Sequence, residues 1–414
     1  MPQARLGDAA WLNEGPVARL LALLDRDGEE ARIVGGAVRN ALLGLPVAEI
    51  DVATTALPAE VMRRVTAAGC KAIPTGIEHG TVTVIIEHQP VEVTTLRQDV
   101  ETFGRKARVA FGRDWRADAE RRDFTINALS ASADGMVYDY VGGLADIAVR
   151  RVRFIGDAQK RIEEDYLRIL RFFRFHAYFG EGAPDAAGLL ACIRARAGLE
   201  RLSRERVRME VLKLLLAPHA APTLAVMTEA GLLGGVLGGV PLLASFENVA
   251  KIEAACGMAP DAVRRLGGLA VLVKEDAERL AQRLRLANAE TERLIALEAW
   301  WRVAPAAREQ AARALFYRLG PQSFADRVLV AWARSPAGTA DAAWRELASL
   351  PQRWTFPVFP LKAADFIRRG LGQGPTLGAA MRAAEAAWIA ADFPLERAAL
   401  DAIADEAAQA GRAH

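Results

Sequence analysis

A glycine pair between an apolar run and a helix-like run, with two carboxylates on the next apolar run, constrains this chain most. Gly35 and Gly36 follow Ile33 and Val34, and Glu49 and Asp51 lie two residues apart further on. Residues two apart on a strand point to the same side. Glycines let phosphate oxygens approach the backbone closely, and a helix that starts there favours anions. We therefore expect a phosphate-binding turn beside a carboxylate pair that holds divalent cations, an arrangement suited to nucleotidyl transfer.

The bulk composition is that of a globular protein and argues against several kinds of site. The 414 residues are too many for one core, so we expect two to four domains. Hydrophobic residues make up 52%, and a formal net charge of +2 does not by itself indicate a nucleic-acid partner. Neither a disulfide framework nor a zinc site is expected, because no CxxC spacing relates the cysteines Cys70, Cys192 and Cys256.

The sequence also predicts a cytoplasmic protein without a membrane partner. Residues 1–8 are polar and lack the apolar core of a signal peptide. No apolar run is long enough to cross a bilayer.

The spacing of apolar residues changes after about Asp139. Before this point, short β-branched runs alternate with turns, which predicts a hairpin at 81–95 and strands at 32–34, 50–53, 81–87 and 91–95. From about Asp146, apolar residues recur every three or four positions, which predicts helices that include 162–175, 204–216, 261–273 and 289–303. We therefore expect an α+β fold, with a small mixed sheet in an N-terminal head and an all-α remainder.

A third carboxylate, Glu92, lies on the second strand of the predicted hairpin. If that strand neighbours the strand of Asp51, Glu92 lies beside Glu49 and Asp51. Three converging carboxylates suit two divalent cations, one that activates an attacking 3′-hydroxyl and one that holds the triphosphate and the leaving pyrophosphate. The competing interpretation is a pair of charged residues on a solvated strand face.

Two further clusters of charged residues have the chemistry of a nucleotide site. Arg121 and Arg122 can bind phosphate bidentately, and Asp123 and Asn127, four apart on a helix-like run, could reach a ribose. The competing interpretation is an ordinary charged start of a helix.

The second cluster, Asp165 and Arg168, is three residues apart on a predicted helix that also carries Arg171 and Arg174. A carboxylate accepts from an exocyclic amine and a guanidinium donates to ring and carbonyl acceptors, so this pair would accept cytosine and adenine and reject guanine and uracil. An exposed ion pair is the competing interpretation.

These motifs, in this order, resemble the class II tRNA nucleotidyltransferases (CCA-adding enzymes), a branch of the polymerase-β-like superfamily shared with bacterial poly(A) polymerases. The resemblance covers roughly residues 32–210 and continues over 357–377. It implies a polymerase-β-like nucleotidyltransferase head followed by an all-α neck, body and tail. The implied parts are a catalytic head at 1–145, a neck with the base-recognition motif at 146–218, a body at 219–348 and a tRNA-binding tail at 349–414.

The resemblance also implies a role for individual residues. The metal pair corresponds to Glu49 and Asp51, with Glu92 as a further catalytic carboxylate and Mg²⁺ as the cofactor of a two-metal site. The implied nucleotide-binding residues are Gly35, Gly36, Arg39, Arg121, Arg122, Asp123, Asn127, Asp165, Arg168, Arg171 and Arg174. Gly104 and Arg105 fall in a flexible loop that helps to switch the pocket from C to A. The implied supports of the base pocket are Glu205, Arg206 and Glu210.

The implied activity is the template-independent addition of C, C and A to the 3′ end of tRNA from CTP and ATP. Two departures bear on it. Glu49 stands where the family has aspartate, so we expect adapted or reduced activity, and the loop 102–105 lacks an acidic residue before Gly104. The alternatives are a poly(A) polymerase, a partial enzyme that adds only CC or only A, and a non-catalytic tRNA-binding relative disabled by Glu49. The run Gly76–Val84 resembles the CCA-adding branch and lacks the basic run of poly(A) polymerases.

Overall fold

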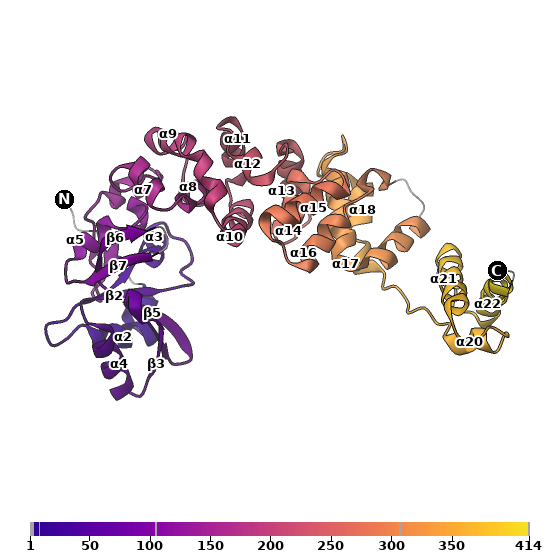
Figure 1. Cartoon of the computed structure of the whole chain (residues 1–414), viewed down its shortest axis with the longest axis horizontal. Coiled ribbons are helices and arrows are strands. Elements are labelled where there is room, and N and C mark those ends of the chain that lie inside the picture. Colours follow the sequence, from indigo (N-terminus) through magenta and orange to yellow (C-terminus); the bar gives the residue numbers. More distant parts are fainter. Residues whose placement is uncertain (1–3, 8, 104–105, 306–308, 413–414) are drawn as a thin grey trace. The chain divides into compact units, whose positions relative to one another are not determined.

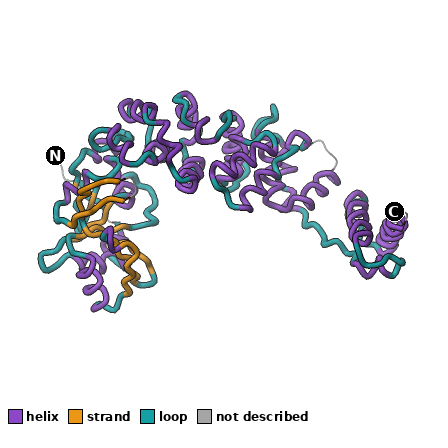
Figure 2. The backbone as a smooth tube through the Cα atoms, in the orientation of Figure 1, coloured by secondary structure: helices purple, strands orange, loops and turns teal. Residues whose placement is uncertain are grey.

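The computed structural model describes residues 4–7, 9–103, 106–305 and 309–412 and divides into two compact units. The first unit is Met1–Val236 and the second is Leu237–His414. Within the described ranges, all strands lie in the first unit, and the second unit consists of helices and loops (Figures 1 and 2). The predicted α+β fold, a mixed sheet followed by a helical remainder, is confirmed. The division into four domains stays a prediction.

A 7-stranded sheet forms the centre of the first unit, in the order β3-β4-β5-β2-β1-β8-β9. β2 and β5 pair in parallel, and the other neighbours pair antiparallel. The strands are β1 (Ala31–Val34), β2 (Asp51–Thr54), β3 (Lys71–Gly76), β4 (Thr81–Ile86), β5 (Gln89–Thr95), β8 (Ser130–Ala131) and β9 (Val137–Tyr138). A separate hairpin joins β6 (Arg97–Phe103) to β7 (Lys106–Phe111). The hairpin predicted for residues 81–95 is confirmed as β4–β5.

One face of the sheet packs against two helices, α2 (Pro16–Leu24) and α4 (Pro58–Ala67). In β4, the buried residues Val82, Val84 and Ile86 alternate with half-buried ones, so the three buried side chains point to the same face of the sheet. These three side chains share one apolar cluster with Leu20 of α2 and Val65 of α4. Burial of each such side chain contributes about 1.5–3 kcal/mol. A second, smaller apolar cluster contains Val34 of β1 and Ala53 of β2.

Helices complete the first unit after the sheet. They are α5 (Trp115–Glu120), α6 (Gly143–Ala148), α7 (Ala158–Glu164), α8 (Leu167–Phe179), α9 (Ala186–Arg194), α10 (Arg204–Leu215), α11 (Ala220–Glu229) and α12 (Leu233–Leu237). Phe172 of α8 stacks on Phe154 at 5.4 Å between ring centroids, and Phe124 lies 4.8 Å from Phe154. This aromatic cluster fixes α8 against the segment that follows α5.

The single helix predicted over residues 162–175 is wrong, because the chain breaks between α7 and α8. Asp165 is extended, with φ −155° and ψ 107°. Its carboxylate accepts a hydrogen bond from the backbone N–H of Leu167 at 3.1 Å. An aspartate that bonds to backbone two residues ahead competes with the helical pattern and starts a new helix.

The second unit contains α13 (Leu243–Ala255), α14 (Ala262–Ala270), α15 (Lys274–Leu284), α16 (Asn288–Ile295), α17 (Glu309–Ala333), α18 (Ala342–Ala348), α19 (Leu350–Arg353), α20 (Ala363–Ile367), α21 (Pro375–Ala390) and α22 (Arg397–Arg412). α17 is kinked at Gly320, where φ is 71°, and Pro321 follows. The last three helices share an apolar cluster around Phe366, Trp388 and Ala404.

The helix predicted over 289–303 is also wrong in its extent. α16 ends at Ile295, and Ala299 adopts a left-handed conformation with φ 59°. A single 3-10 turn, Trp300–Arg302, follows. The apolar spacing that predicts a helix continues through these residues, but Trp301 is exposed and therefore does not lie on a buried helix face.

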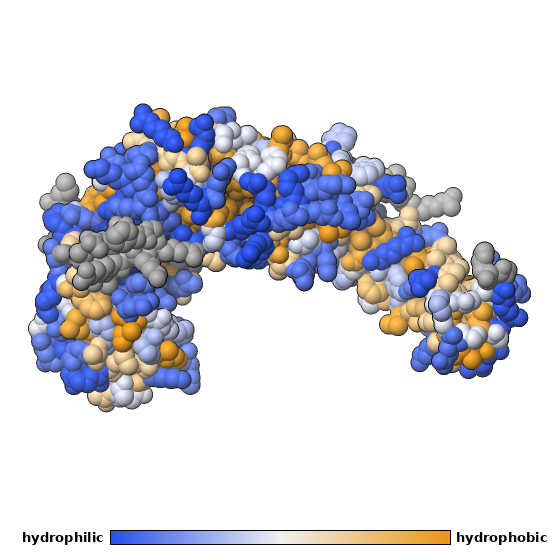
Figure 3. Space-filling model, viewed as in Figure 1, coloured by the Kyte–Doolittle hydropathy of each residue, from blue (hydrophilic) through white to orange (hydrophobic). Residues whose placement is uncertain are grey.

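Among the described residues, no helix is long and apolar enough to span a bilayer. On the face drawn in Figure 3, hydrophilic residues predominate and hydrophobic residues form scattered patches.

Candidate functional site

The predicted phosphate turn is a left-handed glycine between β1 and α3 (Gly36–Leu42). Gly35 has φ 70°, a conformation that residues with a side chain rarely adopt. A Cβ added at Gly35 would lie 3.2 Å from Nη1 of Arg122. The glycine therefore serves two purposes, since it makes the turn and lets a guanidinium lie against the backbone.

The predicted neighbourhood of Asp51 and Glu92 is confirmed. Asp51 is the first residue of β2 and pairs directly with Glu92 of the parallel strand β5. Both residues are exposed, on the side of the strands that faces away from the apolar cluster. Glu49 lies in the loop before β2, so strand alternation does not orient its side chain as predicted, because the extended pairing begins only at Asp51.

Electrostatic repulsion is concentrated on Asp51. Loss of hydration raises the pKa of Asp51 above its usual value, and the nearby charges of Glu92 and Glu49 raise it further. Arg122 acts in the opposite direction. The carboxylates therefore form a small region of negative potential at the start of β2.

The three-carboxylate metal cluster predicted from the sequence is not formed as such. Within the parts of the chain that the structure describes, no group of three or more His, Cys, Asp or Glu residues is arranged to hold a metal ion. Mg²⁺, however, commonly takes one or two protein carboxylates and completes its shell with water and substrate phosphates. Loss of hydration and the charges of Glu92 and Glu49 raise the pKa of Asp51. A cation bound to these carboxylate oxygens would offset that repulsion, so the residues present fit such a cation.

The segment predicted as a helix from Arg121 is a turn instead. α5 ends at Glu120, and only Thr125–Asn127 forms a 3-10 turn. Even so, Asp123 and Asn127 meet, because the Asn127 amide donates to Oδ1 of Asp123 at 3.2 Å. The two residues were correctly predicted to lie together, but a turn and not a helix face brings them there.

Sequence reasoning missed Asp118, which holds both arginines of this motif. Asp118 is buried in α5 and accepts from Nε of Arg121 at 2.8 Å and from Nη2 of Arg122 at 3.3 Å. Arg122 also donates to the backbone carbonyl of Asn127 at 3.3 Å. The signal was present in the spacing, since Asp118 precedes the two arginines by three and four residues.

Arg39 is buried rather than exposed to a phosphate. Its guanidinium donates to Oδ1 of Asn127 and lies 3.9 Å from the ring centroid of Phe179. Burial and the neighbouring charges of Arg174 and Arg171 lower the pKa of Arg39 to about 10, which still leaves it protonated at neutral pH. Arg39 therefore connects the phosphate turn to the segment of Asn127 and to α8.

A chain of ion pairs continues from Asp123 to α10. Both Nε and Nη2 of Arg171 bind Oδ2 of Asp123, at 2.7 and 2.6 Å. Burial by itself would raise the pKa of Asp123, but Arg171 and the hydrogen bonds outweigh it, so the pKa is lowered. Glu210 of α10 accepts from Arg174 at 2.5 Å and lies 3.8 Å from Arg171. Arg171 and Arg174 are thus fixed by carboxylates from two other segments.

Asp165 and Arg168 do not form the helix-face pair that the sequence predicts, because Asp165 precedes α8. Asp165 accepts from both terminal nitrogens of Arg206, at 3.1 and 2.5 Å. Arg168 donates to Glu164 and, at 2.7 Å, to the carbonyl of Arg161. Each residue is therefore oriented by its own partner.

Most of the predicted residues are brought together in the first unit. Arg206 and Glu210 contact the residues that they were expected to support, and Glu205 lies in the first turn of α10. The flexible loop predicted at Gly104 and Arg105 lies outside the described residues.

Comparison with known proteins identifies the family of the chain. The family model described as "Poly A polymerase head domain" matches residues 31–153, and the one described as "Probable RNA and SrmB- binding site of polymerase A" matches residues 189–246. CCA tRNA nucleotidyltransferase 1, mitochondrial, from Mus musculus is 32% identical over 389 residues, which cover 91% of this chain and 87% of that protein. The CCA-adding enzyme of Leuconostoc citreum is 41% identical over 52% of each chain.

A solved structure supports the same relationship. The CCA-adding enzyme of Bacillus stearothermophilus, in complex with CTP, superposes with a TM-score of 0.76. It is 29% identical, and the alignment covers 95% of this chain and 97% of that one. The chain therefore belongs to the family of class II CCA-adding enzymes and poly(A) polymerases.

Proposed function

We infer that this chain is a CCA tRNA nucleotidyltransferase that adds C, C and A to the 3′ end of tRNA from CTP and ATP. The observation that carries this conclusion is the similarity to the mouse enzyme over 91% of the chain. The phosphate turn and the pairing of Asp51 with Glu92 lie within residues 31–153, which match the polymerase head domain. In each round, the 3′-hydroxyl of the RNA attacks the α-phosphate of the incoming nucleotide. A new phosphodiester bond forms, and the bond to pyrophosphate breaks.

We propose that Asp51, with Glu49 and Glu92 beside it, holds divalent cations, with Mg²⁺ as the natural choice. When bound, the cations would lower the pKa of the attacking hydroxyl and neutralise charge on the triphosphate. Arg122, which lies against Gly35, would bind the triphosphate together with Arg121. Preorganised charges of this kind supply most of the catalysis in phosphoryl transfer.

We propose that Asp165 and Arg168 select the base through their hydrogen-bonding edges. Arg206 binds both oxygens of the Asp165 carboxylate, and Oδ2 retains a lone pair for an exocyclic amine. Arg168, held by Glu164, would donate to the acceptors of cytosine or adenine. Guanine and uracil present the opposite polarity, and mismatched buried polar groups are costly.

Replacing Asp165 by asparagine is expected to reduce the preference for CTP over UTP by about 10–100-fold, because an amide can also donate to a carbonyl and a hydrogen bond to a charged group contributes about 1.5–3 kcal/mol. The measurement is kcat/KM for each nucleotide on a tRNA that ends before CCA. Asp157→Asn is the matched control, since Asp157 caps α7 by accepting from Lys160 N–H and belongs to no predicted nucleotide contact. An unchanged CTP/UTP ratio in Asp165→Asn would rule out this role.

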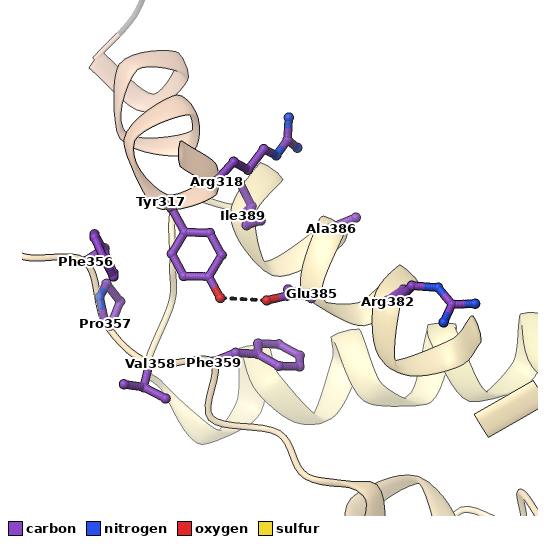
Figure 4. A pocket seen from close by; sticks show the side chains of 10 residues that line it. All are labelled: Tyr317, Arg318, Phe356, Pro357, Val358, Phe359, Arg382, Glu385, Ala386 and Ile389. Atoms are coloured by element: carbon purple, nitrogen blue, oxygen red, sulfur yellow. Dashed lines mark hydrogen bonds between the residues drawn. The ribbon is translucent and has the colours of Figure 1, made fainter. Parts of the chain in front are cut away.

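The tail was predicted to bind tRNA, and we propose a groove of about 740 Å³ in the second unit as part of that surface. Its walls come from α17, the segment 356–359 and α21, and Figure 4 shows Tyr317 inside, bonded to Glu385. Burial and Glu385 raise the pKa of Tyr317 to about 12, so it remains a donor. The guanidinium groups of Arg318 and Arg382 point away from the Tyr317 ring in Figure 4, which leaves them available to phosphates.

Replacing Arg382 by alanine is expected to weaken tRNA binding and to reduce the slope of log Kd against log salt by about 0.7–0.9, the loss of one phosphate contact. The KM for CTP should not change, because the proposed nucleotide contacts lie in the first unit. Titrations at several salt concentrations measure both quantities. Arg397→Ala, which removes an exposed arginine paired with Asp401, is the control. A loss of affinity with an unchanged slope would contradict a phosphate contact.

The activity is tested by offering CTP, ATP, GTP and UTP singly to tRNA transcripts that end before CCA, after C and after CC. We expect C on the first two substrates, A on the third, and refusal of G and U. Long A tracts would instead identify a poly(A) polymerase. Binding of tRNA without incorporation, restored by Glu49→Asp, would identify the relative disabled by Glu49. This assay does not test the predicted cytoplasmic location, which stays a prediction.

A further inference from the structure

The side chain of Asn40 bonds in two directions at once. Asn40 lies on α3, next to Arg39, and is half-buried. Its Oδ1 accepts from Nε and Nη2 of Arg39, at 3.1 and 2.9 Å. Its Nδ2 donates to the carbonyl of Pro46 at 3.0 Å. Only a carboxamide offers an acceptor to one neighbour and an amino donor to the other through one short, planar group.

The backbone of Asn40 organises the same loop. Its carbonyl accepts from the N–H groups of Leu43 and Leu45, at 3.1 and 2.9 Å. Both ends of residue 40 thus bond into the chain that connects α3 to β2. That loop carries Glu49 and ends at Asp51, the proposed cation-binding carboxylates.

The bond to Pro46 fixes a segment that has few other anchors. Within residues 43–50, Val47 and Ile50 pack against the apolar cluster of the sheet, whereas Pro46 and Glu49 are exposed. A loop without regular pairing keeps its shape through such individual bonds, since each one offsets part of the entropy of ordering the backbone.

The bonds to Arg39 fix the other side of the site. Arg39 donates to Asn127, which bonds to Asp123 of the proposed ribose segment. A guanidinium bound through two nitrogens keeps one orientation, because its donors lie in a rigid plane.

We propose that Asn40 is a positioning residue that couples Arg39, which holds the proposed ribose segment through Asn127, to the loop that carries the cation-binding Glu49. The proposal rests on the proposed function of Glu49 as a carboxylate of the cation site. Asn40 touches neither nucleotide nor cation in this account. Its Oδ1 fixes the orientation of the Arg39 guanidinium, and its Nδ2 fixes the position of the loop that carries Glu49.

Two substitutions in the full chain separate the effect of the bonds to Arg39 from the effect of the bond to Pro46. Asn40→Ala removes both bonds, so we expect weaker Mn²⁺ binding and a higher KM for CTP, each by about threefold or more. Asn40→Asp keeps an acceptor for Arg39 but cannot donate to Pro46. It should therefore restore the KM for CTP and leave Mn²⁺ binding weakened. Mn²⁺ binding is measured by electron paramagnetic resonance titration of the protein with Mn²⁺ alone, which does not require activity.

The controls separate a failure of the coupling through Asn40 from a failure of the proposed role of Glu49. Asn248→Asp removes a comparable bond, from a side-chain amide to the carbonyl of Ala333 at 2.9 Å in the second unit, and should leave Mn²⁺ binding unchanged. Glu49→Gln should weaken Mn²⁺ binding, and if it does not, the proposed role of Glu49 fails. If Glu49→Gln weakens binding while Asn40→Asp does not, only the coupling through Asn40 fails. Should Asn40→Ala not fold, Asn40→Asp alone decides the loop half, since its Mn²⁺ affinity either falls or overturns the proposal.

Discussion

Replacing Asp51 by asparagine is expected to lower nucleotide incorporation by about 1,000-fold or more while leaving the protein at least as stable at neutral pH. Loss of a cation-binding carboxylate removes several kcal/mol of transition-state stabilisation, and each 1.36 kcal/mol is a factor of ten. Stability should not fall, because reduced hydration and repulsion from Glu92 and Glu49 already disfavour the charge of Asp51 in the folded protein. Single-turnover incorporation of C and thermal melting measure the two effects.

The direction of the pH dependence follows from the raised pKa of Asp51. In the unfolded chain this carboxyl loses its proton near its ordinary pKa, whereas in the folded protein it does so only at higher pH. The wild type therefore loses stability relative to Asp51→Asn as the pH rises through this interval, and the difference vanishes at lower pH.

Asp134→Asn is the opposite control for this prediction. Hydrogen bonds from Ser132 and the Met136 N–H lower the pKa of Asp134, so its asparagine variant should lose stability at neutral pH and keep full activity. An Asp51→Asn enzyme with near wild-type incorporation would contradict the assignment of Asp51. A lower melting temperature for Asp51→Asn at neutral pH would contradict the electrostatic argument.

Replacing Glu253 by alanine is expected to destabilise the second unit by about 3–5 kcal/mol, because it removes the carboxylate that two buried arginines share. Glu253 is 1% exposed and accepts from Arg264 and Arg265, each at 2.8 Å. Arg264 also binds the buried Asp326 at 3.0 Å, so the loss extends through a connected network. Urea unfolding monitored by circular dichroism measures the change in the free energy of unfolding.

An exposed ion pair provides the matched control for Glu253. Lys251 and Glu247 lie one turn apart on the same helix, at 2.8 Å, with 58% and 51% of their side chains exposed. Lys251→Ala should cost at most about 1 kcal/mol. The KM for CTP should stay near wild type in folded Glu253→Ala, since the nucleotide contacts lie in the first unit. Equal effects of Glu253→Ala and Lys251→Ala would show that the buried network does not stabilise this unit.

Local patterns in the sequence predicted the parts of the site that local geometry determines. The glycine turn at Gly35 and the helix after it follow from residue types alone. Glu92 was predicted to lie beside Asp51 if their strands were neighbours, and the parallel pairing of β2 with β5 meets this condition. These features are confirmed because a strand with one buried face allows a single choice of side.

Other parts depend on bonds between distant segments, which no spacing reveals. Asp165 leaves the helical pattern because its side chain accepts from the Leu167 N–H and binds Arg206, 41 residues away. Arg39 was expected at a phosphate, but Asn127, 88 residues away, and Phe179 hold it inside the protein. Asn40 drew no prediction because its partner, the carbonyl of Pro46, lies in a loop without periodicity.

We expect this site, with Glu49 in place, to complete the CCA end. The most direct measurement supplies CTP and ATP together, with Mg²⁺, to a tRNA transcript that ends before CCA, and resolves the products at single-nucleotide length. We predict two additions that require CTP, one further addition that requires ATP, and no product beyond it. A ladder of longer A-containing products, or a tRNA that is bound but not extended, would contradict it.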